Sequence, residues 1–170
     1  DLRAFYIKQR KKLDIFSNKQ TIDYLYQNFT YLFKGGNGYP AILKKNVIKK
    51  KIVLGYQNEK INFKCIKIKH GSIYALGYIF KNIAYISDCS SLSKKNINEL
   101  SNLNTLIIDC LWFRQHYSHL NFAKVIKLVN ILKPKKTVLT NMHTDIDYSY
   151  LKKKVPKNVF PGYDGMKLFS

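Results

Sequence analysis

The alternation of apolar and polar residues predicts a chain that starts with a short strand and a helix and continues with several strands. Lys12 to Ser17 has the apolar content of a strand, and Asn18 is a typical cap for a helix that runs to about Asn28. Within a later strand the two-residue period slips near Cys65, which predicts a β-bulge there. Four apolar-rich runs are expected to form strands: Lys51 to Gly55, Ile61 to Lys69, Ser72 to Phe80 and Ile83 to Ile86.

Beyond Asp88 the period changes, and helices alternate with strands. Ser93 is expected to cap a helix over Lys94 to Leu100, and Pro134 to stop an amphipathic helix over Phe122 to Leu132. The order of antiparallel strands first and β-α units later predicts an α/β or α+β fold with helices packed outside sheets. The remaining elements are predicted to be strands at Thr105 to Asp109, Lys136 to Thr140 and Gly165 to Phe169, and a helix at Tyr148 to Lys154.

Length and composition predict one domain, 1–170, with a sizeable core, because 46% of the 170 residues are apolar. The sequence has no apolar stretch long enough to span a membrane and no signal-peptide pattern, so we expect a protein that is neither membrane-bound nor exported. The cysteines Cys65, Cys89 and Cys110 are widely spaced, which favours reduced thiols in a cytoplasmic protein.

The formal charge of +20 raises the question of a nucleic-acid partner. Of the 30 basic residues 27 are Lys, and they are spread along the chain, whereas readout of bases and phosphates favours the Arg fork. The many Ile, Asn, Tyr and Phe residues are what A/T-rich codons would give, so genome composition explains the charge more simply. A nucleic-acid partner is therefore not favoured, but a basic surface would help to attract a phosphate-bearing substrate.

All four histidines, His70, His116, His119 and His143, lie at or just beyond the ends of predicted elements. Imidazole is the commonest protein ligand for transition metals, and a strand-end carboxylate such as Asp88 can bridge two cations. Taken singly, an Asp in a turn or a His in a surface loop has an ordinary structural role. Spacing alone therefore leaves both a metal site and a set of turn residues open.

Eight segments in order resemble the metallo-β-lactamase superfamily, and within it the branch that contains the phosphoribosyl cyclic phosphate phosphodiesterase. The resemblance implies an αββα sandwich, incomplete here at the amino terminus, with two divalent metal ions, Zn or Mn, at the rim between the sheets. The segments are Asp1-Leu2-Arg3, Tyr31-Leu32-Phe33, His70-Gly71 with Leu76-Gly77-Tyr78, Ala84-Tyr85-Ile86-Ser87-Asp88, Asp109-Cys110-Leu111, His116-Tyr117-Ser118-His119-Leu120, Leu139-Thr140-Asn141-Met142-His143 and Tyr163-Asp164-Gly165-Met166.

The resemblance also implies roles for individual residues. It makes His70 a ligand of the first metal and Asp88 the carboxylate that bridges both metals. It places His119 beside the substrate phosphate as a catalytic group that serves the leaving oxygen, with His116 assisting. A histidine with a pKa near neutrality suits this work, because it can give or hold a proton at working pH.

The last ligand position departs from the family pattern, because the phosphodiesterase has a Thr-His pair where this chain has Thr140-Asn141. Either His143, two positions later, replaces the missing imidazole, or Asn141 occupies the ligand position and the second metal is held weakly. We favour His143, since a strand-end loop can present alternate residues to the same side. Asp109 and Asp164 are candidates for hydrogen bonds to the ligand imidazoles, with structural turn roles equally open.

The largest departure is at the amino terminus, where the family signature HxHxDH would stand just before the segment that ends here as Asp1-Leu2-Arg3. That signature supplies four ligands, so His70, Asp88 and His143 are too few for two metals. We therefore expect the carboxy-terminal two-thirds of an enzyme, with partial or no metal occupancy and no activity on its own. Three origins stay open: a split or decaying gene, pairing with a separate amino-terminal fragment, and an incomplete sequence; a homodimer is also considered.

The implied function of the intact protein is metal-dependent hydrolysis of a small cyclic phosphate or nucleotide-like ester by a phosphodiesterase. One alternative is an RNA-processing endonuclease of the same fold, similar to the tRNA 3′-end endonucleases. The charge of +20 favours it, but no inserted arm rich in Gly, Pro and basic residues is evident. The other alternative is a catalytically inactive remnant that holds little metal.

Overall fold

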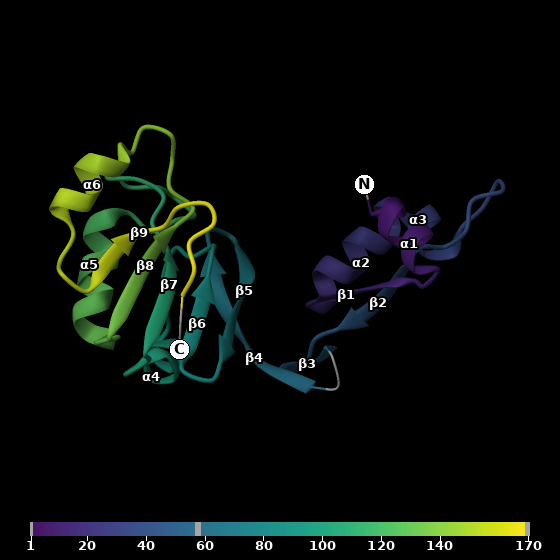
Figure 1. Cartoon of the computed structure of the whole chain (residues 1–170), viewed down its shortest axis with the longest axis horizontal. Coiled ribbons are helices and arrows are strands. Elements are labelled where there is room, and N and C mark those ends of the chain that lie inside the picture. The colour runs from purple at the N-terminus through teal and green to yellow at the C-terminus, as the bar shows by residue number, and fades with distance from the viewer. Residues whose placement is uncertain (1, 57–58, 169–170) are drawn as a thin grey trace. The chain divides into compact units, whose positions relative to one another are not determined.

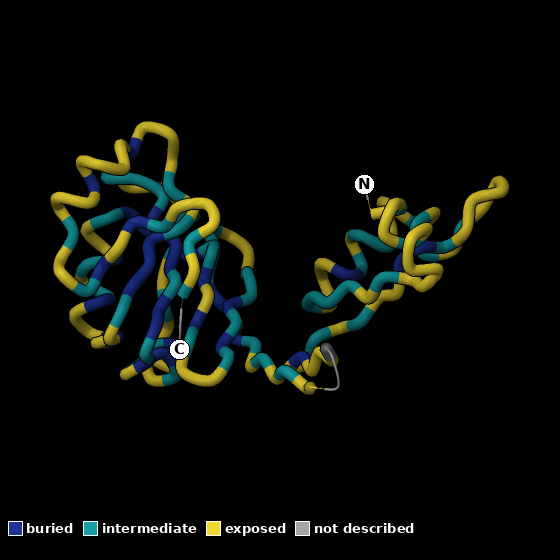
Figure 2. The backbone as a smooth tube through the Cα atoms, in the orientation of Figure 1, coloured by how far each residue is buried: buried dark blue, intermediate teal, exposed yellow. Residues whose placement is uncertain are grey.

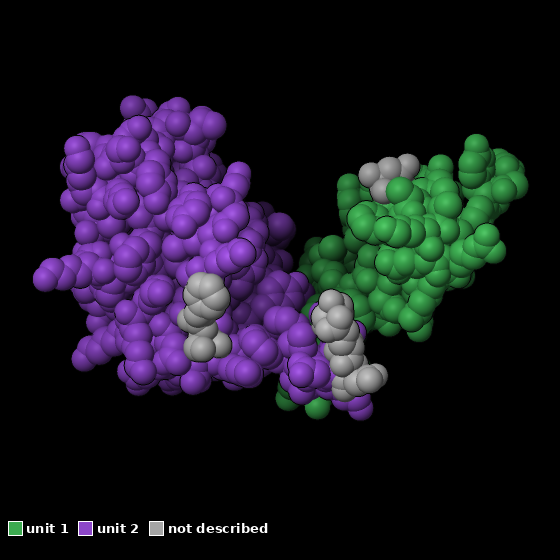
Figure 3. All heavy atoms as spheres, in the orientation of Figure 1, with its two compact units in different colours: residues 1–52 green, residues 53–170 purple. Residues whose placement is uncertain are grey.

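The computed structural model describes residues 2–56 and 59–168, and it divides the chain into two compact units, residues 1–52 and 53–170 (Figure 3). The single domain expected from the sequence stays a prediction. In the first unit β1 and β2 pair in parallel, with Leu13 opposite Leu43. Its elements are α1 (Arg3–Gln9), β1 (Leu13–Ser17), α2 (Lys19–Asn28), α3 (Thr30–Lys34) and β2 (Leu43–Val47).

The rest of the chain is organised around a seven-stranded sheet in the order β3-β4-β5-β6-β7-β8-β9 (Figure 1). The pairs β4·β5 and β5·β6 are antiparallel, and β6 to β9 are parallel neighbours. This order confirms the predicted mixed α/β class. The elements are β3 (Lys51–Tyr56), β4 (Glu59–His70), β5 (Ile73–Phe80), β6 (Ile83–Ile86), α4 (Lys94–Leu100), β7 (Thr105–Asp109), α5 (Phe122–Leu132), β8 (Lys136–Thr140), α6 (Tyr148–Lys154) and β9 (Val159–Pro161).

Local capping signals explain where the predicted helices begin. The Asn18 side chain accepts a hydrogen bond from the Thr21 backbone N–H at 2.9 Å at the start of α2. Ser93 and Asn96 form a reciprocal capping box at the start of α4, and the Asn121 side chain caps α5. Each cap satisfies backbone donors that the first helical turn leaves without a partner. The predicted bounds of these helices are confirmed.

The predicted β-bulge near Cys65 is wrong. The register of β4 against β5 is regular there, with Cys65 opposite Tyr78 and Ile66 opposite Gly77. The slip in the sequence pattern has another cause. Cys65 lies on one face of β4, and the buried Ile66 and Ile68 lie on the opposite face. Both faces of this strand therefore bury apolar residues, and no extra residue is needed.

The predicted closing strand over Gly165 to Phe169 is also wrong in its described part. The last strand is β9 (Val159–Pro161), which pairs in parallel with β8, and Gly165 lies in a turn with a φ of 82°. Phe169 lies outside the described residues. A three-residue strand that contains Pro161 gives too short a period-two pattern to find from the sequence. The short elements α1, α3 and β2 were missed for the same reason.

One face of the large sheet and its helices enclose the main core (Figure 2). Strand and helix side chains interleave there, and most are completely buried, so burial of apolar area on this face holds α4, α5 and α6 against the sheet. Within the described residues, no helix is both long enough and apolar enough to cross a bilayer. Core members include Ile68, Ile86, Leu106, Ile108 and Leu139 from strands, and Leu100, Val125, Leu132 and Leu151 from helices.

Strand directions bring four chain segments to one edge of the sheet. Because β4 and β6 both run antiparallel to β5, they point the same way, and β7 and β8 run parallel to β6. The carboxyl ends of β4, β6, β7 and β8 therefore lie at the same edge. His70, Asp88, Asp109 and Asn141 lie at or just beyond these ends.

Truncation of a central core residue should weaken the fold much more than truncation on the surface. Leu139 is completely buried in β8, and Leu139→Ala is expected to lower the free energy of unfolding by about 2–5 kcal/mol through lost burial and the cavity left behind. Urea denaturation followed by circular dichroism measures this change. The control is Ile131→Ala in α5, where the side chain is 55% exposed and the expected change is within about 0.5 kcal/mol. Similar losses in both variants would contradict the described core.

Candidate metal centre

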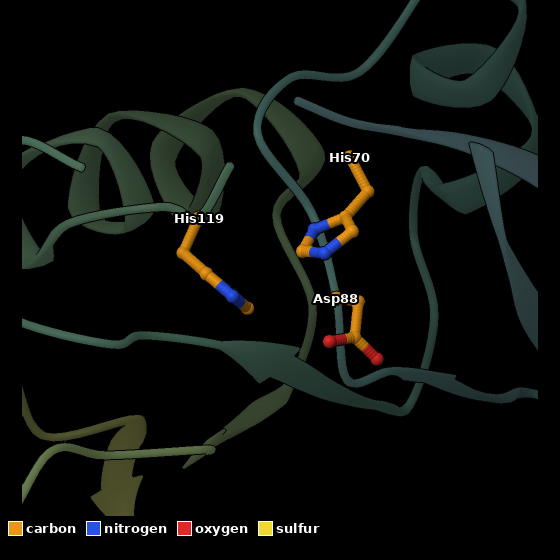
Figure 4. A group of neighbouring side chains, drawn as sticks. All are labelled: His70, Asp88 and His119. Atoms are coloured by element: carbon orange, nitrogen blue, oxygen red, sulfur yellow. The ribbon is translucent and has the colours of Figure 1, made fainter. Parts of the chain in front are cut away.

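Two side chains at the ends of β4 and β6, and one from the loop between β7 and α5, converge on one space (Figure 4). His70, Asp88 and His119 each offer one donor atom, and these atoms all lie within 4.8 Å of one another. The His70 and His119 rings meet edge to face, with centroids 4.7 Å apart. All three side chains are partly buried, so the space between them is only partly open to water.

The orientation of His70 is fixed by the loop that follows β7. Its Nδ1 lies 2.8 Å from the backbone carbonyl oxygen of Ser118. A carbonyl oxygen can only accept, so Nδ1 carries the proton and donates it to this bond. The neutral ring then has its lone pair on Nε2, which is the arrangement a metal ligand needs.

Gly71 allows the turn after His70 to fit against the same loop. Its backbone is left-handed, with a φ of 57°, and its N–H donates to Ser90 Oγ at 3.2 Å. A Cβ at this position would lie 2.8 Å from Tyr117 Cε1 and 3.0 Å from Ser118 Cβ. Only glycine gives both the left-handed backbone and the space that the loop occupies.

Asp88 enters the cluster from the end of β6. Ser87 Oγ donates a hydrogen bond of 2.6 Å to Asp88 Oδ2, which leaves lone pairs on the other carboxylate oxygen. The cluster therefore contains one carboxylate and two imidazoles.

His119 is held by the buried carboxylate of Asp109, with its Nδ1 3.0 Å from Asp109 Oδ2. The same oxygen accepts from the backbone N–H groups of Cys89 at 3.1 Å and Leu120 at 3.2 Å. Asp109 Oδ1 accepts from Asn141 Nδ2 at 3.2 Å. Burial raises the pKa of the Asp109 carboxyl, and the Cys89 N–H bond and the attraction to His119 act in the opposite direction. Three donors from Cys89, Leu120 and Asn141 therefore already point at the two oxygens, and Asn141 Nδ2 also lies 3.3 Å from His119 Nδ1. With Nδ1 as the donor to Asp109 Oδ2, the Nε2 of the neutral His119 ring is free.

The two remaining histidines have the opposite pattern. His116 Nδ1 accepts from the Ser118 backbone N–H at 3.3 Å, and the His116 ring lies 5.2 Å from the His119 ring. His143 Nδ1 accepts from the Asp145 N–H at 3.2 Å, while the ring stacks on Trp112 at a centroid distance of 4.7 Å. In the neutral state the His116 ring therefore carries its proton on Nε2, whereas His143 Nδ1 also lies 3.4 Å from Asp145 Oδ1, an acceptor to which it can donate instead. His143 is not a member of the three-residue cluster among the described residues, so its role as a ligand stays a prediction.

The two other residues that the sequence assigned to supporting roles lie in different surroundings. Asn141, left-handed with a φ of 58°, uses its Nδ2 to bridge Asp109 Oδ1 and the Ser87 carbonyl oxygen, both at 3.2 Å. Asp164 lies exposed in the turn after β9. Asp164 borders an open cavity of about 420 Å³, which Asn141, Tyr163 and Met166 also line but His70, Asp88 and His119 do not.

Sequence reasoning named Asp109 as a hydrogen-bond partner for an imidazole, but it missed the Ser118 carbonyl that orients His70. The Ser118 carbonyl is a backbone atom with no signal in the sequence, and Ser87 and Ser90 resemble ordinary turn residues. Gly71 was the one available signal, because a glycine directly after a strand-end histidine indicates a tight turn that needs positive φ.

The donor set fits a divalent transition-metal ion. Two imidazole Nε2 lone pairs and one carboxylate suit Zn, Mn or Fe better than Mg or Ca, which prefer oxygen ligands. Three protein ligands with further positions open are typical of catalytic rather than structural zinc sites. Together, the mixed fold and this donor cluster are typical of proteins that bind a divalent transition-metal ion.

Comparison with known proteins places the chain in a family. Residues 1–142 match the beta-lactamase superfamily domain. The chain therefore belongs to the metallo-β-lactamase superfamily, which confirms the resemblance seen in the sequence. The match runs across both compact units.

Solved structures support the same fold. A new diphosphatase from the PhnP family aligns with a TM-score of 0.80 at 22% identity, over 92% of this chain and 57% of its own. The metallo-beta-lactamase fold protein YhfI from Bacillus subtilis aligns with a TM-score of 0.70 at 18% identity, over 97% of this chain and 68% of its own. At these identities the likeness shows the fold.

A curated relative is an octanoyltransferase of Porphyromonas gingivalis, 24% identical over 170 residues. The match covers 98% of this chain but 34% of the relative's length. This chain therefore spans about a third of that relative and somewhat more than half of the diphosphatase.

Gly71→Ala should lower the free energy of unfolding by more than the cost of placing an alanine in a left-handed backbone conformation. Gly165 is the matched control, because it has a φ of 82° and an added Cβ would meet no heavy atom within 4 Å. Left-handed backbone costs about 1–2 kcal/mol at either position, so both Ala variants should lose that much free energy of unfolding. Gly71→Ala must also push Ser118 away from His70, so we expect a larger loss in urea denaturation. Equal losses would contradict the close contact at Gly71.

Proposed function

We propose that this chain provides the greater part of a metal-dependent hydrolase that cleaves a small phosphate ester, as a phosphodiesterase. The observation that carries the proposal is the convergence of two imidazoles and one carboxylate, each with a donor atom within 4.8 Å of the others, at the edge of the sheet. A cation at such a position would speed phosphoester hydrolysis, because it stabilises negative charge on the phosphoryl oxygens in the transition state. The diphosphatase with the same fold acts on a related phosphorus–oxygen bond by its own description.

In this proposal His70 and Asp88 hold the cation, which when bound supplies Lewis-acid polarisation of a phosphoryl oxygen and of water. Ser87 fixes the Asp88 carboxylate through its 2.6 Å hydrogen bond, so that the free oxygen stays directed into the cluster. The Ser118 carbonyl does the same for His70. These contacts reduce the reorganisation that binding would otherwise require.

His119 is the proton donor to the leaving oxygen in this proposal, with His116 assisting. Asp109 Oδ2 lies 3.0 Å from His119 Nδ1 and orients the ring, so that the cationic ring can pass the proton on its Nε2 to the leaving oxygen and return to the neutral form. The exposed position of His116, next to the His119 ring, suits contact with a bound ester. The high positive charge of the chain favours the approach of a phosphate anion.

The same proposal includes two metal ions and an additional segment that completes the enzyme. Two divalent ions, Zn or Mn, would need ligands beyond the three on this chain, such as an amino-terminal HxHxDH segment on the same or a separate polypeptide. The alternative of an RNA-processing endonuclease rests on the +20 charge, and tRNA binding that falls steeply with salt would favour it. A folded chain that binds no Zn²⁺ or Mn²⁺ would favour the inactive remnant.

Phosphodiesterase turnover should depend on Asp88. With Mn²⁺ or Zn²⁺ and a small cyclic phosphodiester, on the chain joined to a segment that carries HxHxDH, we expect Asp88→Ala to lower kcat/KM by about 100-fold or more. The control is Asp23→Ala, an exposed carboxylate in α2 that pairs with Lys19 and should leave turnover unchanged. Turnover that is absent in the unmodified protein, or indifferent to Asp88→Ala, would contradict the proposal.

A further inference from the structure

A second cavity lies at the open edge of the large sheet, beside α6 and β9. Its volume is about 450 Å³, which is within the range of small-molecule sites. β9 is the last strand in the order of the sheet, and α6 contacts it (Figure 1). None of His70, Asp88 and His119 lines this cavity, so it is separate from the candidate metal centre.

The turn between α6 and β9 fixes one wall of the cavity. Helix α6 ends at Lys154, shortly before Pro156, which has no N–H and cannot continue it. The Val159 N–H closes the turn by donating to the Pro156 carbonyl at 2.9 Å. The Asn158 carbonyl accepts from the Thr137 N–H of β8 at 2.8 Å, which anchors the turn to the sheet. The cavity therefore exists before a ligand binds, which lowers the entropic cost of binding.

Two lysines supply positive charge to the cavity, and no acidic residue lines it among the described residues. Lys152 lies in the last turn of α6, and Lys157 lies in the turn that follows. Within the part of the chain that the structure describes, neither ammonium group forms a salt bridge. Asp147 caps α6 by accepting from the Tyr150 N–H at 2.6 Å, and Asp164 lines the other cavity. The two uncompensated charges fit a phosphate dianion.

Three aromatic side chains supply flat apolar surface in the same cavity. Tyr148 and Tyr163 pack edge to face, with ring centroids 6.4 Å apart. Their exposed fractions are 38% and 59%, and Phe160 is 38% exposed. Exposed aromatic rings can stack with a nucleobase, because every base has a flat π surface. The lining therefore offers contacts to both a base and a phosphate.

The form of the cavity favours a rigid, planar ligand. Most of its lining residues are exposed, so it is a wide recess and not an enclosed tunnel. A fatty-acid chain would lose rotational freedom there and would still leave many CH₂ groups in water, whereas a nucleobase has no rotatable bonds within its ring system. Inorganic phosphate would use the lysines but leave the aromatic rings in contact with water.

We propose that this cavity binds a nucleoside monophosphate. The base stacks on the exposed rings, above all on Tyr163, and the phosphate pairs with Lys152 and Lys157. The site goes beyond the proposed phosphodiesterase activity and does not depend on it, because it shares no residue with the candidate metal centre.

AMP binding to the full chain tests the proposal. The titration is done calorimetrically in excess EDTA, so that no metal ion can hold the phosphate elsewhere. Lys152→Ala and Lys157→Ala should each weaken AMP binding by about 10-fold, as expected for the loss of one charge-assisted hydrogen bond. The matched control is Lys153→Ala, which removes the same charge from the next position of α6 but does not line the cavity. It should leave AMP binding unchanged.

Tyr163 tests the stacking contact. Tyr163→Ala should weaken AMP binding by about 10-fold, whereas Tyr163→Phe, which keeps the ring, should bind AMP like the unmodified chain. Nuclear magnetic resonance gives a second measurement that needs no variant. In ¹H–¹⁵N spectra of the unmodified chain, AMP should shift the backbone amide signals of Lys152, Lys157 and Tyr163 but not that of His119.

Other results would overturn the inference. Ribose 5-phosphate that binds as tightly as AMP would mean that no base stacks, and decanoate that binds more tightly would assign the cavity to a fatty carboxylate. Single-stranded oligo(A) that binds much more tightly, with shifted amide signals outside the cavity, would make the partner a nucleic acid. Absence of AMP binding at millimolar concentrations, or equal weakening by Lys152→Ala and Lys153→Ala, would also contradict the site. None of these results bears on the phosphodiesterase activity, which Asp88→Ala tests.

Discussion

The buried carboxylate of Asp109 is the interaction on which the geometry of the site depends. It has no exposure to solvent, and its two oxygens accept from Cys89, Leu120, His119 and Asn141. These donors belong to the segments that follow β6, β7 and β8, so one charge joins three strand ends. A buried charge is tolerated only with such complete hydrogen bonding, and removal of any donor would leave it poorly satisfied. The position of His119 is therefore a consequence of the fold as much as of the loop that carries it.

Much of the fold could be predicted from the sequence because its determinants are local. Asn18, Ser93 and Asn121 mark helix starts by side-chain caps, and the strands of the main sheet have clear apolar runs. The errors occurred where local pattern and tertiary surroundings diverge. Cys65, which is half-buried, and Ile66, which is buried, lie on opposite faces of β4, and two successive apolar residues resemble a bulge in the sequence. The strand Val159–Pro161 is defined by its pairing with β8 and has almost no pattern of its own.

The candidate site was only partly predictable for a related physical reason. Strand ends and histidine positions are visible in the sequence, and the regular register of β6 to β8 explains why residues beyond those ends meet. Which nitrogen of His70 is free depends on the Ser118 carbonyl, a backbone atom that leaves no pattern in the sequence. For His119 it depends on Asp109, which the sequence offered only as one of two candidates for imidazole hydrogen bonds. Asn141 has a left-handed backbone, and its side chain reaches Asp109. Asn tolerates this conformation better than most residues, but the spacing of residues in the sequence does not show where it occurs.

The charge of the chain bears on what such a centre can bind. A cation within a protein of net charge +20 is disfavoured by long-range repulsion, which the nearby carboxylates Asp88 and Asp109 offset only locally. An anionic ester changes this balance, because it adds negative charge at the open positions of the cation and is itself attracted by the lysine-rich surface. Cation and phosphate should therefore bind cooperatively, each strengthening the affinity for the other by the same factor. A strongly basic hydrolase can therefore hold a metal with few protein ligands, because the anionic substrate supplies part of the negative charge that binds the metal.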